Sequence, residues 1–149
     1  ENAPELWAVN SNLEPYSRFA LRKYIAEQPN DLYQSGTLRL IICKSDTNEA
    51  IGIIDIFDFS PIHNRAEVAI AILQNEQNKG YGTAALKELE QYTRKKLRLR
   101  MLYAYISEEN NKESQKCFSS AGYHHVATLP AWHYNGEDYE NVSFFQLFL

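Results

Sequence analysis

The residues that could most readily do chemistry lie in one turn, residues 77–83 (QNKGYGT), between an apolar run and a helical pattern. A helix that begins here leaves its first backbone N–H groups unpaired, and its dipole places positive charge at the same point. Gly80 and Gly82 lack the Cβ atoms that would keep an anion away from those amides, and Lys79 adds a cation. The pattern predicts a phosphate or pyrophosphate site, although two glycines also form tight loops that bind nothing.

The same turn matches a second kind of site. Residues 80–85 (GYGTAA) fit the dinucleotide fingerprint GxGxxA, and Glu108, at the end of the next strand, would then bind the ribose. The order of elements speaks against this alternative, because a dinucleotide fold opens with the turn and continues with several β-α-β units. Here three strands precede the turn and one β-α-β crossover follows. A P-loop is excluded because the chain contains no GK[ST] motif.

A second motif follows in the order that one family uses. Residues 111–114 read Asn-x-x-Ser, and the helix after them ends in Gly-Tyr at residues 122–123. Together with residues 77–82, this pattern resembles the GNAT superfamily of acyl-CoA-dependent N-acyltransferases. The signatures of that family are Gln/Arg-x-x-Gly-x-Gly/Ala after the fourth strand and Asn-x-x-Ser before a helix that ends in Gly-Phe or Gly-Tyr. The resemblance extends from about residue 37 to the C-terminus.

The resemblance implies acetyl-CoA as the co-substrate and no metal. The residues that it places around the pyrophosphate are Gln77, Lys79, Gly80, Tyr81, Gly82 and Thr83. The backbone of Ile72, Leu73 and Gln74 would pair with the pantetheine arm like an added strand. Asn111 would hold the distal part of the coenzyme, and Ser114 belongs to the same binding signature. The thioester would lie in a gap between the strand that bears Ile72 and the strand at residues 101–106, and the amine would approach from the other side.

An acceptor amine needs a base. Its unperturbed pKa lies near 10, so at pH 7 only about one molecule in a thousand carries the free lone pair. Glu67, at the start of the strand that leads to the turn, is the first candidate, with Asp55 and Asp58 on the neighbouring strand as alternatives. Each of the three also fits a solvated carboxylate at a strand edge. His63 would relay a proton or simply lie exposed in its loop.

The leaving thiolate lacks an obvious acid. Many members of the resembled family place a tyrosine seven residues after the signature Asn to protonate the sulfur, but here this position is Phe118. Water, Ser114 or Tyr123 would have to replace it, or the thiolate would leave unaided because the pKa of a free thiol is only about 8.5. A backbone N–H near Leu73 would stabilise the oxyanion. Cys117 is interpreted as a packed helix residue.

These residues predict an N-acetyltransferase in which a primary amine attacks the acetyl group directly in a ternary complex. The acceptor would be a polyamine, another small amine or a protein N-terminus, since residues 63–67 (HNRAE) and 135–136 (NG) are similar to the spermidine and ribosomal-protein acetyltransferase branches. Residues 132–134 (WHY) would contact the amine, or form a hydrophobic patch or a homodimer contact. Phe118 leaves a second function open, a non-catalytic sensor that binds acyl-CoA.

Length, charge and composition narrow the class of protein. At 149 residues the chain fits a single domain, residues 1–149, and no apolar run is long enough to span a bilayer. The net charge of −4 argues against general nucleic-acid binding and slightly favours cationic acceptors. The two cysteines have no metal-site spacing, and the basic residues 94–100 (RKKLRLR) fit the solvated end of a helix. Without a recognisable secretion signal, a cytoplasmic location is expected.

The elements that must position these residues follow from periodicity. Helices are predicted at residues 15–28, from residue 80 for about four turns, and at residues 111–121 with Gly122 as the C-terminal cap. Strands are predicted at residues 37–44, 50–59, 66–73, 101–106, 123–129 and 142–148.

This order indicates an α/β protein with antiparallel pairing at both ends. The resemblance implies the GNAT fold, with a mixed, mostly antiparallel sheet, a parallel splayed pair at the acyl-CoA site, and helices on both faces. Residues 1–8 resemble the end of the first helix of that family, so the first strand is expected to be missing from the chain.

Overall fold

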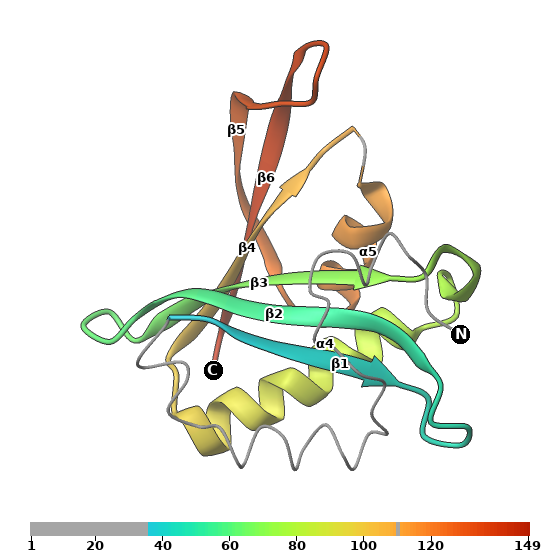
Figure 1. Cartoon of the computed structure of the whole chain (residues 1–149). Coiled ribbons are helices and arrows are strands. Elements are labelled where there is room, and N and C mark those ends of the chain that lie inside the picture. Colours follow the sequence, from blue (N-terminus) through green and yellow to red (C-terminus); the bar gives the residue numbers. More distant parts are fainter. Residues whose placement is uncertain (1–35, 110) are drawn as a thin grey trace.

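The sheet is the centre of the structure. A computed structural model describes residues 36–109 and 111–149, and over this part of the chain six strands form one sheet in the order β1-β2-β3-β4-β6-β5 (Figure 1). Only the pair β3 and β4 is parallel; the other four pairs are antiparallel. The predicted α/β class with a mixed, mostly antiparallel sheet is confirmed.

The first three strands form the predicted meander. β1 (Leu38–Cys43) and β2 (Ala50–Ser60) pair as a hairpin, and β3 (Arg65–Ile72) returns along β2. These strands are rich in β-branched residues, which fit a pleated and half-buried surface. A bulge in β2 between Phe57 and Ser60 places Asp58 in a left-handed conformation, with φ of 52°. The bulge lies where β2 passes the start of β3.

Two helices follow the change of period in the sequence. α4 (Tyr81–Tyr92) comes after the short 3-10 turn η1 (Gln74–Glu76) and continues as a π-helical turn, η2 (Thr93–Leu97). The crossover leads into β4 (Met101–Ser107) and then α5 (Lys112–Ser120). The chain leaves α5 through Gly122, whose φ of 100° is the left-handed conformation expected of a C-terminal glycine.

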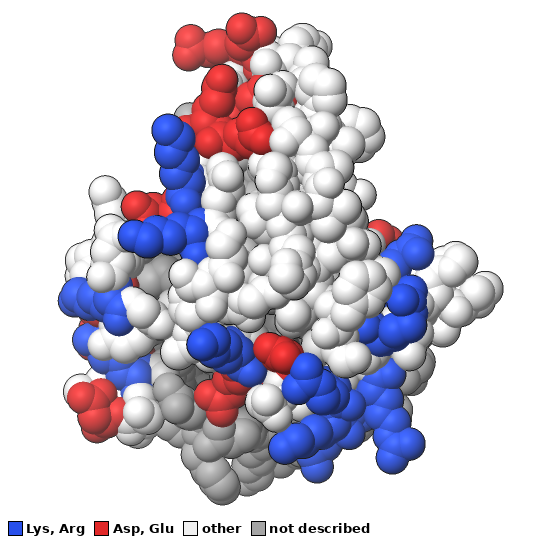
Figure 2. Space-filling view, turned by 180° about the vertical axis from the view of Figure 1, so that it is seen from behind, with Lys and Arg blue, Asp and Glu red and all other residues white. Residues whose placement is uncertain are grey.

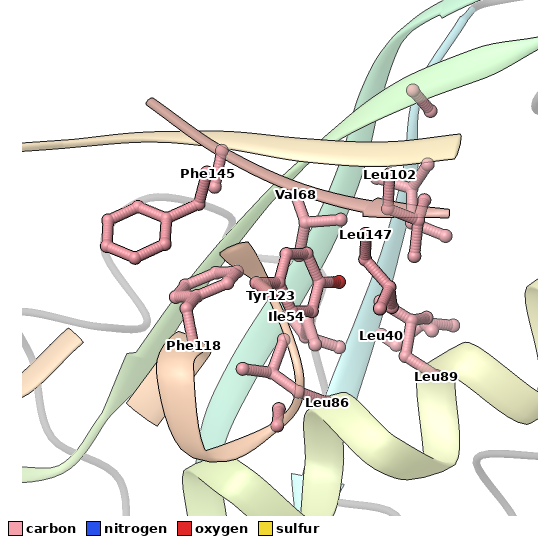
Figure 3. Close-up of a cluster of buried hydrophobic side chains, with 14 of the residues drawn as sticks. Leu40, Ile54, Val68, Leu86, Leu89, Leu102, Phe118, Tyr123, Phe145 and Leu147 are labelled. Atoms are coloured by element: carbon pink, nitrogen blue, oxygen red, sulfur yellow. The ribbon is translucent and has the colours of Figure 1, made fainter. Parts of the chain in front are cut away.

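The core lies between one face of the sheet and both described helices. Leu86 and Leu89 of α4 and Phe118 of α5 pack against alternate residues of the strands, such as Val68 of β3 and Leu102 of β4 (Figure 3). Side chains alternate across a strand, so the neighbours of these core residues point to the opposite face. This alternation places two different sets of side chains on the two faces of the sheet where β3 and β4 lie side by side.

The C-terminal hairpin is longer than predicted. β5 (His124–Tyr134) and β6 (Tyr139–Phe148) extend almost to the turn at residues 135–138, so residues 132–134 belong to a strand rather than to a connecting segment. The rings of Tyr134 and Tyr139 pack across the hairpin near the turn, with centroids 5.1 Å apart, whereas the sequence prediction ended the strand at Leu129, where the register of the pairing shifts. The helix predicted at residues 15–28 and the missing first strand lie outside the described residues.

Charge is unevenly distributed on the surface. Seen from behind, acidic side chains gather at the end of the molecule where the β5–β6 hairpin projects, and basic side chains gather toward the opposite end (Figure 2). Within residues 94–100 the basic side chains are exposed, whereas the two leucines, Leu97 and Leu99, are buried. The prediction of a solvated basic end of a helix is confirmed.

Candidate active site

The parallel strands β3 and β4 form a fork. They pair over three residues of each strand, from Arg65 opposite Met101 to Glu67 opposite Tyr103. Beyond Glu67, β3 keeps β2 on one side but has no paired strand on the other among the described residues. β4 pairs with β6 along its whole length instead. The predicted splayed pair is therefore present, and it leaves an open strand edge up to Ile72.

The hydrogen bonds of β3 determine which backbone groups face the gap of the fork. The N–H of Leu73 donates to the carbonyl oxygen of Ile51 over 2.8 Å. Because this bonding alternates along an antiparallel pair, Ala71 also faces β2, whereas Ile70 and Ile72 face the gap. The predicted oxyanion donor is therefore not Leu73 itself, whose N–H already has a partner. The neighbouring N–H groups of Ile70 and Ile72 are the candidates.

The turn after β3 is closed by the first residue of the signature. The Nε2 of Gln77 donates to the carbonyl oxygen of Ile72 over 3.0 Å. Asn78 and Gly80 both have left-handed backbones, with φ of 63° and 85°. Gly80 is the N-cap of α4, and no side chain caps the helix there. The first amides of α4 therefore have no partner within the helix, as an anion site requires.

A cavity of about 690 Å³ extends from the open edge of β3 across the turn to the first turns of α4 and α5. This volume lies within the usual range for small-molecule sites. The residues of the predicted coenzyme site that line it are Ile72, Gln77, Gly80, Tyr81, Gly82, Thr83, Asn111 and Ser114. The two sequence signatures thus meet in one cavity. Leu73, Gln74 and Lys79 were also predicted for the site but do not line the cavity.

α5 is anchored so that its first turn faces this cavity. The Nε2 of Gln115 donates to the carbonyl oxygens of Ser107 and Glu108 at the end of β4, each over 3.1 Å. Asn111 is the N-cap of the helix, but its side chain makes no capping hydrogen bond. An asparagine in this position usually satisfies a backbone N–H of its own helix. Its amide is therefore not used for capping and remains available to a ligand.

Two lysines other than the predicted Lys79 line the cavity. The Nζ of Lys79 lies 3.3 Å from a carboxylate oxygen of Glu76, and Lys79 does not line the cavity. Lys112 and Lys116, four residues apart on α5, line it instead. Residues with this spacing share one helix face, and Lys112 directly follows the signature Asn111. That spacing was a signal that sequence reasoning did not use.

Gly82 has a packing role that was not predicted. A Cβ at this position would lie 2.6 Å from the Sγ of Cys117 on α5 and would clash with it. The glycine therefore permits close packing of α4 on α5, in addition to bordering the cavity. The Oγ1 of Thr83 also contacts this sulfur, at 3.8 Å, and burial raises the pKa of the Cys117 thiol. Cys117 is therefore a helix residue that packs against the core, as interpreted, and it also lines the cavity.

Glu67 is the last residue of β3 that pairs with β4, so it lies at the base of the fork. Its neighbours Ala66 and Val68 are in the core beneath the helices, and the Glu67 side chain therefore points to the opposite face of the sheet. Partial burial, with the nearby charge of Asp58 as a second cause, raises the pKa of Glu67 to about 7. A carboxylate with such a pKa is well matched to accept a proton near neutral pH.

The two alternative bases have other partners. Asp55 accepts two hydrogen bonds from the guanidinium of Arg39, both over 2.7 Å, which is the bidentate geometry of a strong ion pair. Asp58 accepts a hydrogen bond from the Tyr103 hydroxyl over 2.8 Å. His63 lies exposed before β3. Glu67, at the base of the fork, therefore remains the first candidate for the base.

The candidate acids are unequal. Phe118 is buried in the core, where its ring contacts that of Tyr123 at a centroid distance of 4.8 Å. The Tyr123 hydroxyl is also buried, has no hydrogen-bond partner, and does not line the cavity. Burial raises the pKa of Tyr123 far above its usual range. Tyr123 therefore does not replace the missing tyrosine, and Ser114 is the predicted hydroxyl that lines the cavity.

Aromatic rings line the sheet face that carries Glu67. The rings of Tyr103, Tyr105 and Phe144 contact one another, with centroids 5.0–6.0 Å apart. Tyr103 pairs with Glu67 across the fork, so this aromatic cluster begins beside the carboxylate. Trp132 and Tyr134 are exposed on the projecting hairpin instead. The amine contact predicted for residues 132–134 is untested, and the aromatic cluster is an alternative that sequence reasoning missed.

The family of the chain follows from comparison with known proteins. The model of the acetyltransferase (GNAT) domain matches residues 2–124, more than half of the chain. The chain therefore belongs to the GNAT acetyltransferase family. No curated protein matches it.

Solved structures show the same fold. The spermidine N-acetyltransferase from Vibrio cholerae, in complex with CoA and spermine, has a TM-score of 0.71 at 20% identity; the match covers 91% of this chain and 78% of that one. RimL, a ribosomal-protein alpha-N-acetyltransferase, has a TM-score of 0.72 at 16% identity and covers 85% and 78%. An acetyltransferase of the GNAT family from Bacillus anthracis has a TM-score of 0.68 at 17% identity and covers 74% and 65%.

No helix within residues 36–109 and 111–149 is both long enough and apolar enough to cross a bilayer. The same residues contain no group of three or more His, Cys, Asp or Glu side chains that could hold a metal ion.

Proposed function

We propose that the protein transfers the acetyl group of acetyl-CoA to a primary amine by direct attack in a ternary complex. The observation that supports this most is the fork. Its open β3 edge borders the cavity on the helix side of the sheet, and Glu67 lies at its base with a side chain on the other side. Donor and acceptor would therefore meet in the gap from opposite faces.

The residues of the cavity fit acetyl-CoA. The outward-facing backbone of Ile70 and Ile72 offers hydrogen bonds to an extended amide-containing arm, in the manner of an added strand. The unpaired amides at the start of α4 and the ammonium groups of Lys112 and Lys116 suit phosphate groups. A dinucleotide fits less well, because its fold needs several parallel pairs, and the described sheet has one.

The acceptor would be a cationic amine. Glu67 and Asp58 place negative charge beside the aromatic cluster of Tyr103, Tyr105 and Phe144, and aromatic faces attract ammonium groups. A polyamine, another small amine and a protein N-terminus all share this chemistry. One structural neighbour is described in complex with spermine, and another acts on a ribosomal protein.

The reaction would use few side chains. The bound coenzyme supplies an acetyl thioester that a free amine can attack. Glu67 takes the proton of the ammonium, which frees the nitrogen lone pair. The N–H of Ile72 or Ile70 stabilises the developing oxyanion. Phe118 occupies the position of the expected tyrosine, and Tyr123 does not line the cavity, so water or Ser114 supplies the proton, or the sulfur leaves as the anion.

Thiol release provides the test. The protein is mixed with acetyl-CoA and a panel that contains a polyamine, a monoamine and a peptide with a free N-terminus, and free CoA is measured with a thiol reagent. We expect release with at least one cationic amine, and acetylation of that amine by mass spectrometry. Absence of release with every amine, despite CoA binding by calorimetry, would contradict the enzyme proposal.

That negative outcome would support the second candidate, a sensor that binds acyl-CoA without turnover. The observation in its favour is the burial of Phe118, which fills with a core ring the position where many relatives carry a tyrosine acid. Binding of NAD and not of CoA would instead support the dinucleotide alternative.

A further inference from the structure

A buried carboxylate lies at the edge of the coenzyme cavity. Glu76, in the 3-10 turn that precedes the signature turn, is only 6% exposed and lines the cavity. A negative charge beside a site for phosphate groups would by itself weaken their binding. Burying a carboxylate is also costly unless it is paired. Its partners therefore determine what Glu76 does.

Two lysines from different segments bind this carboxylate. The Nζ of Lys44 lies 3.3 Å from one oxygen of Glu76, and the Nζ of Lys79 lies 3.3 Å from the other. Lys44 directly follows β1 in the β1–β2 turn, whereas Lys79 is within the signature turn. Burial alone would raise the pKa of the Glu76 carboxyl, but the two ammonium groups together hold it below its usual range.

Lys44 also reaches the start of α4. Its Nζ lies 5.7 Å from the centre of the Tyr81 ring, and Tyr81 is the first residue of the helix and lines the cavity. A second carboxylate, Glu49, lies 3.7 Å from the same Nζ. The group Lys44, Glu76 and Lys79 therefore links the β1–β2 turn, the 3-10 turn and the start of α4.

This link acts on the part of the chain whose backbone must bind the phosphates. Asn78 and Gly80 have left-handed backbones, and no side chain caps α4. The local hydrogen bonds that precede these residues are those of the Gln77 side chain to Ile72 and of the backbone N–H groups of Glu76 and Gln77 to the carbonyl oxygens of Leu73 and Gln74, so the ion pairs of Glu76 add a link to a distant segment. A turn that is competent for only part of the time binds its ligand more weakly in proportion to that fraction.

We propose that Glu76 is a positioning residue of the coenzyme site, and that its ion pairs with Lys44 and Lys79 hold the signature turn in the conformation that binds acyl-CoA. The inference rests on the proposed function for the identity of the ligand. It assigns to Lys44, which lies outside both sequence signatures, a role in coenzyme binding that does not require contact with the coenzyme.

Three variants of the full chain test this role: Glu76→Gln, Lys44→Met and, as the control, Lys96→Met. The control removes one exposed charge in η2, the turn that continues α4. The probe is CoA, with its dissociation constant measured by calorimetry. Hydrogen exchange of residues 74–83 is measured without CoA. We expect each of the first two variants to weaken CoA binding about tenfold or more, because the turn becomes competent for a minor fraction of the time. Exchange should accelerate in residues 74–83, and Lys96→Met should match the wild type.

The outcomes are distinct. Wild-type CoA affinity and exchange in both Glu76→Gln and Lys44→Met would overturn the inference. Tighter binding by Glu76→Gln would also overturn it, because Glu76 would then only repel the phosphates. If the wild-type protein does not bind CoA, the proposed function fails, and the exchange of residues 74–83 alone decides whether Glu76 orders the turn. Lys44 is half-buried, so its variant remains informative if Glu76→Gln does not fold.

Discussion

At the scale of single residues, the environment of Glu67 determines how activity should depend on pH. Its pKa of about 7 means that the carboxylate form needed in a base is lost as the pH falls through 7. We expect kcat/KM for an active amine to rise with pH up to about 7 in the limb that belongs to Glu67. Replacement by glutamine should remove this limb and lower kcat on the order of 10²–10⁴-fold. Steady-state rates between pH 5.5 and 9 measure both effects.

The Glu67→Gln variant can also be checked by its affinity for CoA and by its melting temperature. Glu67 does not line the cavity, so Glu67→Gln should leave CoA affinity unchanged. A carboxyl group whose folded pKa is raised opposes folding once the pH exceeds its unfolded pKa, and fully so above its folded pKa. The glutamine variant should therefore melt at a higher temperature than the wild type at pH 8, and show no such gain at pH 4. A lower melting temperature at both pH values would contradict this account of Glu67.

Asp58 allows the second cause of the Glu67 shift to be separated from the first. Burial is the larger cause, and the charge of Asp58 adds to it. We expect Asp58→Asn to move the pH limb to lower pH without abolishing it, because burial remains. Tyr103→Phe is the control, since it removes the hydrogen bond to Asp58 but leaves its charge. If Asp58→Asn left the limb in place, the two carboxylates would not interact in the active protein.

At the scale of elements, α5 supplies two lysines that line the cavity, whereas Lys79 of the signature turn does not line it. Lys112→Met and Lys116→Met should each weaken CoA binding, by about threefold at low salt, since exposed charges contribute roughly 0.2–1 kcal/mol. The loss should shrink as salt increases. Lys87→Met is the control, because Lys87 is exposed on α4 and does not line the cavity. Calorimetric titration with CoA at two salt concentrations distinguishes this account from one in which Lys79 is the main cation.

Two glycines control how closely elements approach around the cavity. A Cβ at Gly52 would lie 2.4 Å from the carbonyl oxygen of Ala71, which belongs to the backbone of β3 and cannot rotate away. We expect Gly52→Ala to lower the free energy of unfolding by about 1–3 kcal/mol, as overpacking usually does, and to weaken CoA binding. Chemical denaturation and calorimetry measure the two effects.

Gly82→Ala provides a comparison for Gly52→Ala, because its new methyl group would meet a side chain and not backbone. An alanine there would meet the Cys117 sulfur, so Gly82→Ala should be rescued by Cys117→Ala in the double variant. No side-chain truncation can rescue Gly52→Ala, because its neighbour is backbone. Equal stability of Gly52→Ala and the wild type would show that β2 and β3 separate there without cost.

The elements also show how much of the site could be predicted from the sequence. The meander, α4 and α5 follow from periodicity, and Gly80 and Gly122 have the left-handed backbones expected at the ends of the helices. The ion pair of Lys79 was not predicted because Glu76, an ordinary polar residue in the sequence, becomes buried in the fold. The length of β5 was missed because the strand resumes its pairing with β6 at His133, beyond a shift of register that follows Leu129. Such contacts between distant segments leave no local pattern.

At the scale of the whole molecule, the cavity joins three parts of the fold: the open edge of β3, the start of α4 and the start of α5. A ligand that contacts all three should stabilise the folded state as a unit. At a CoA concentration 100 times its dissociation constant, the expected gain is about 2.7 kcal/mol, provided that the unfolded chain does not bind CoA. Thermal unfolding with CoA, with NAD and without ligand measures this gain. We expect CoA alone to raise the melting temperature, and Lys112→Met should reduce the shift at a fixed CoA concentration. An equal shift with NAD would contradict the assignment of the cavity to acyl-CoA and favour a general phosphate site.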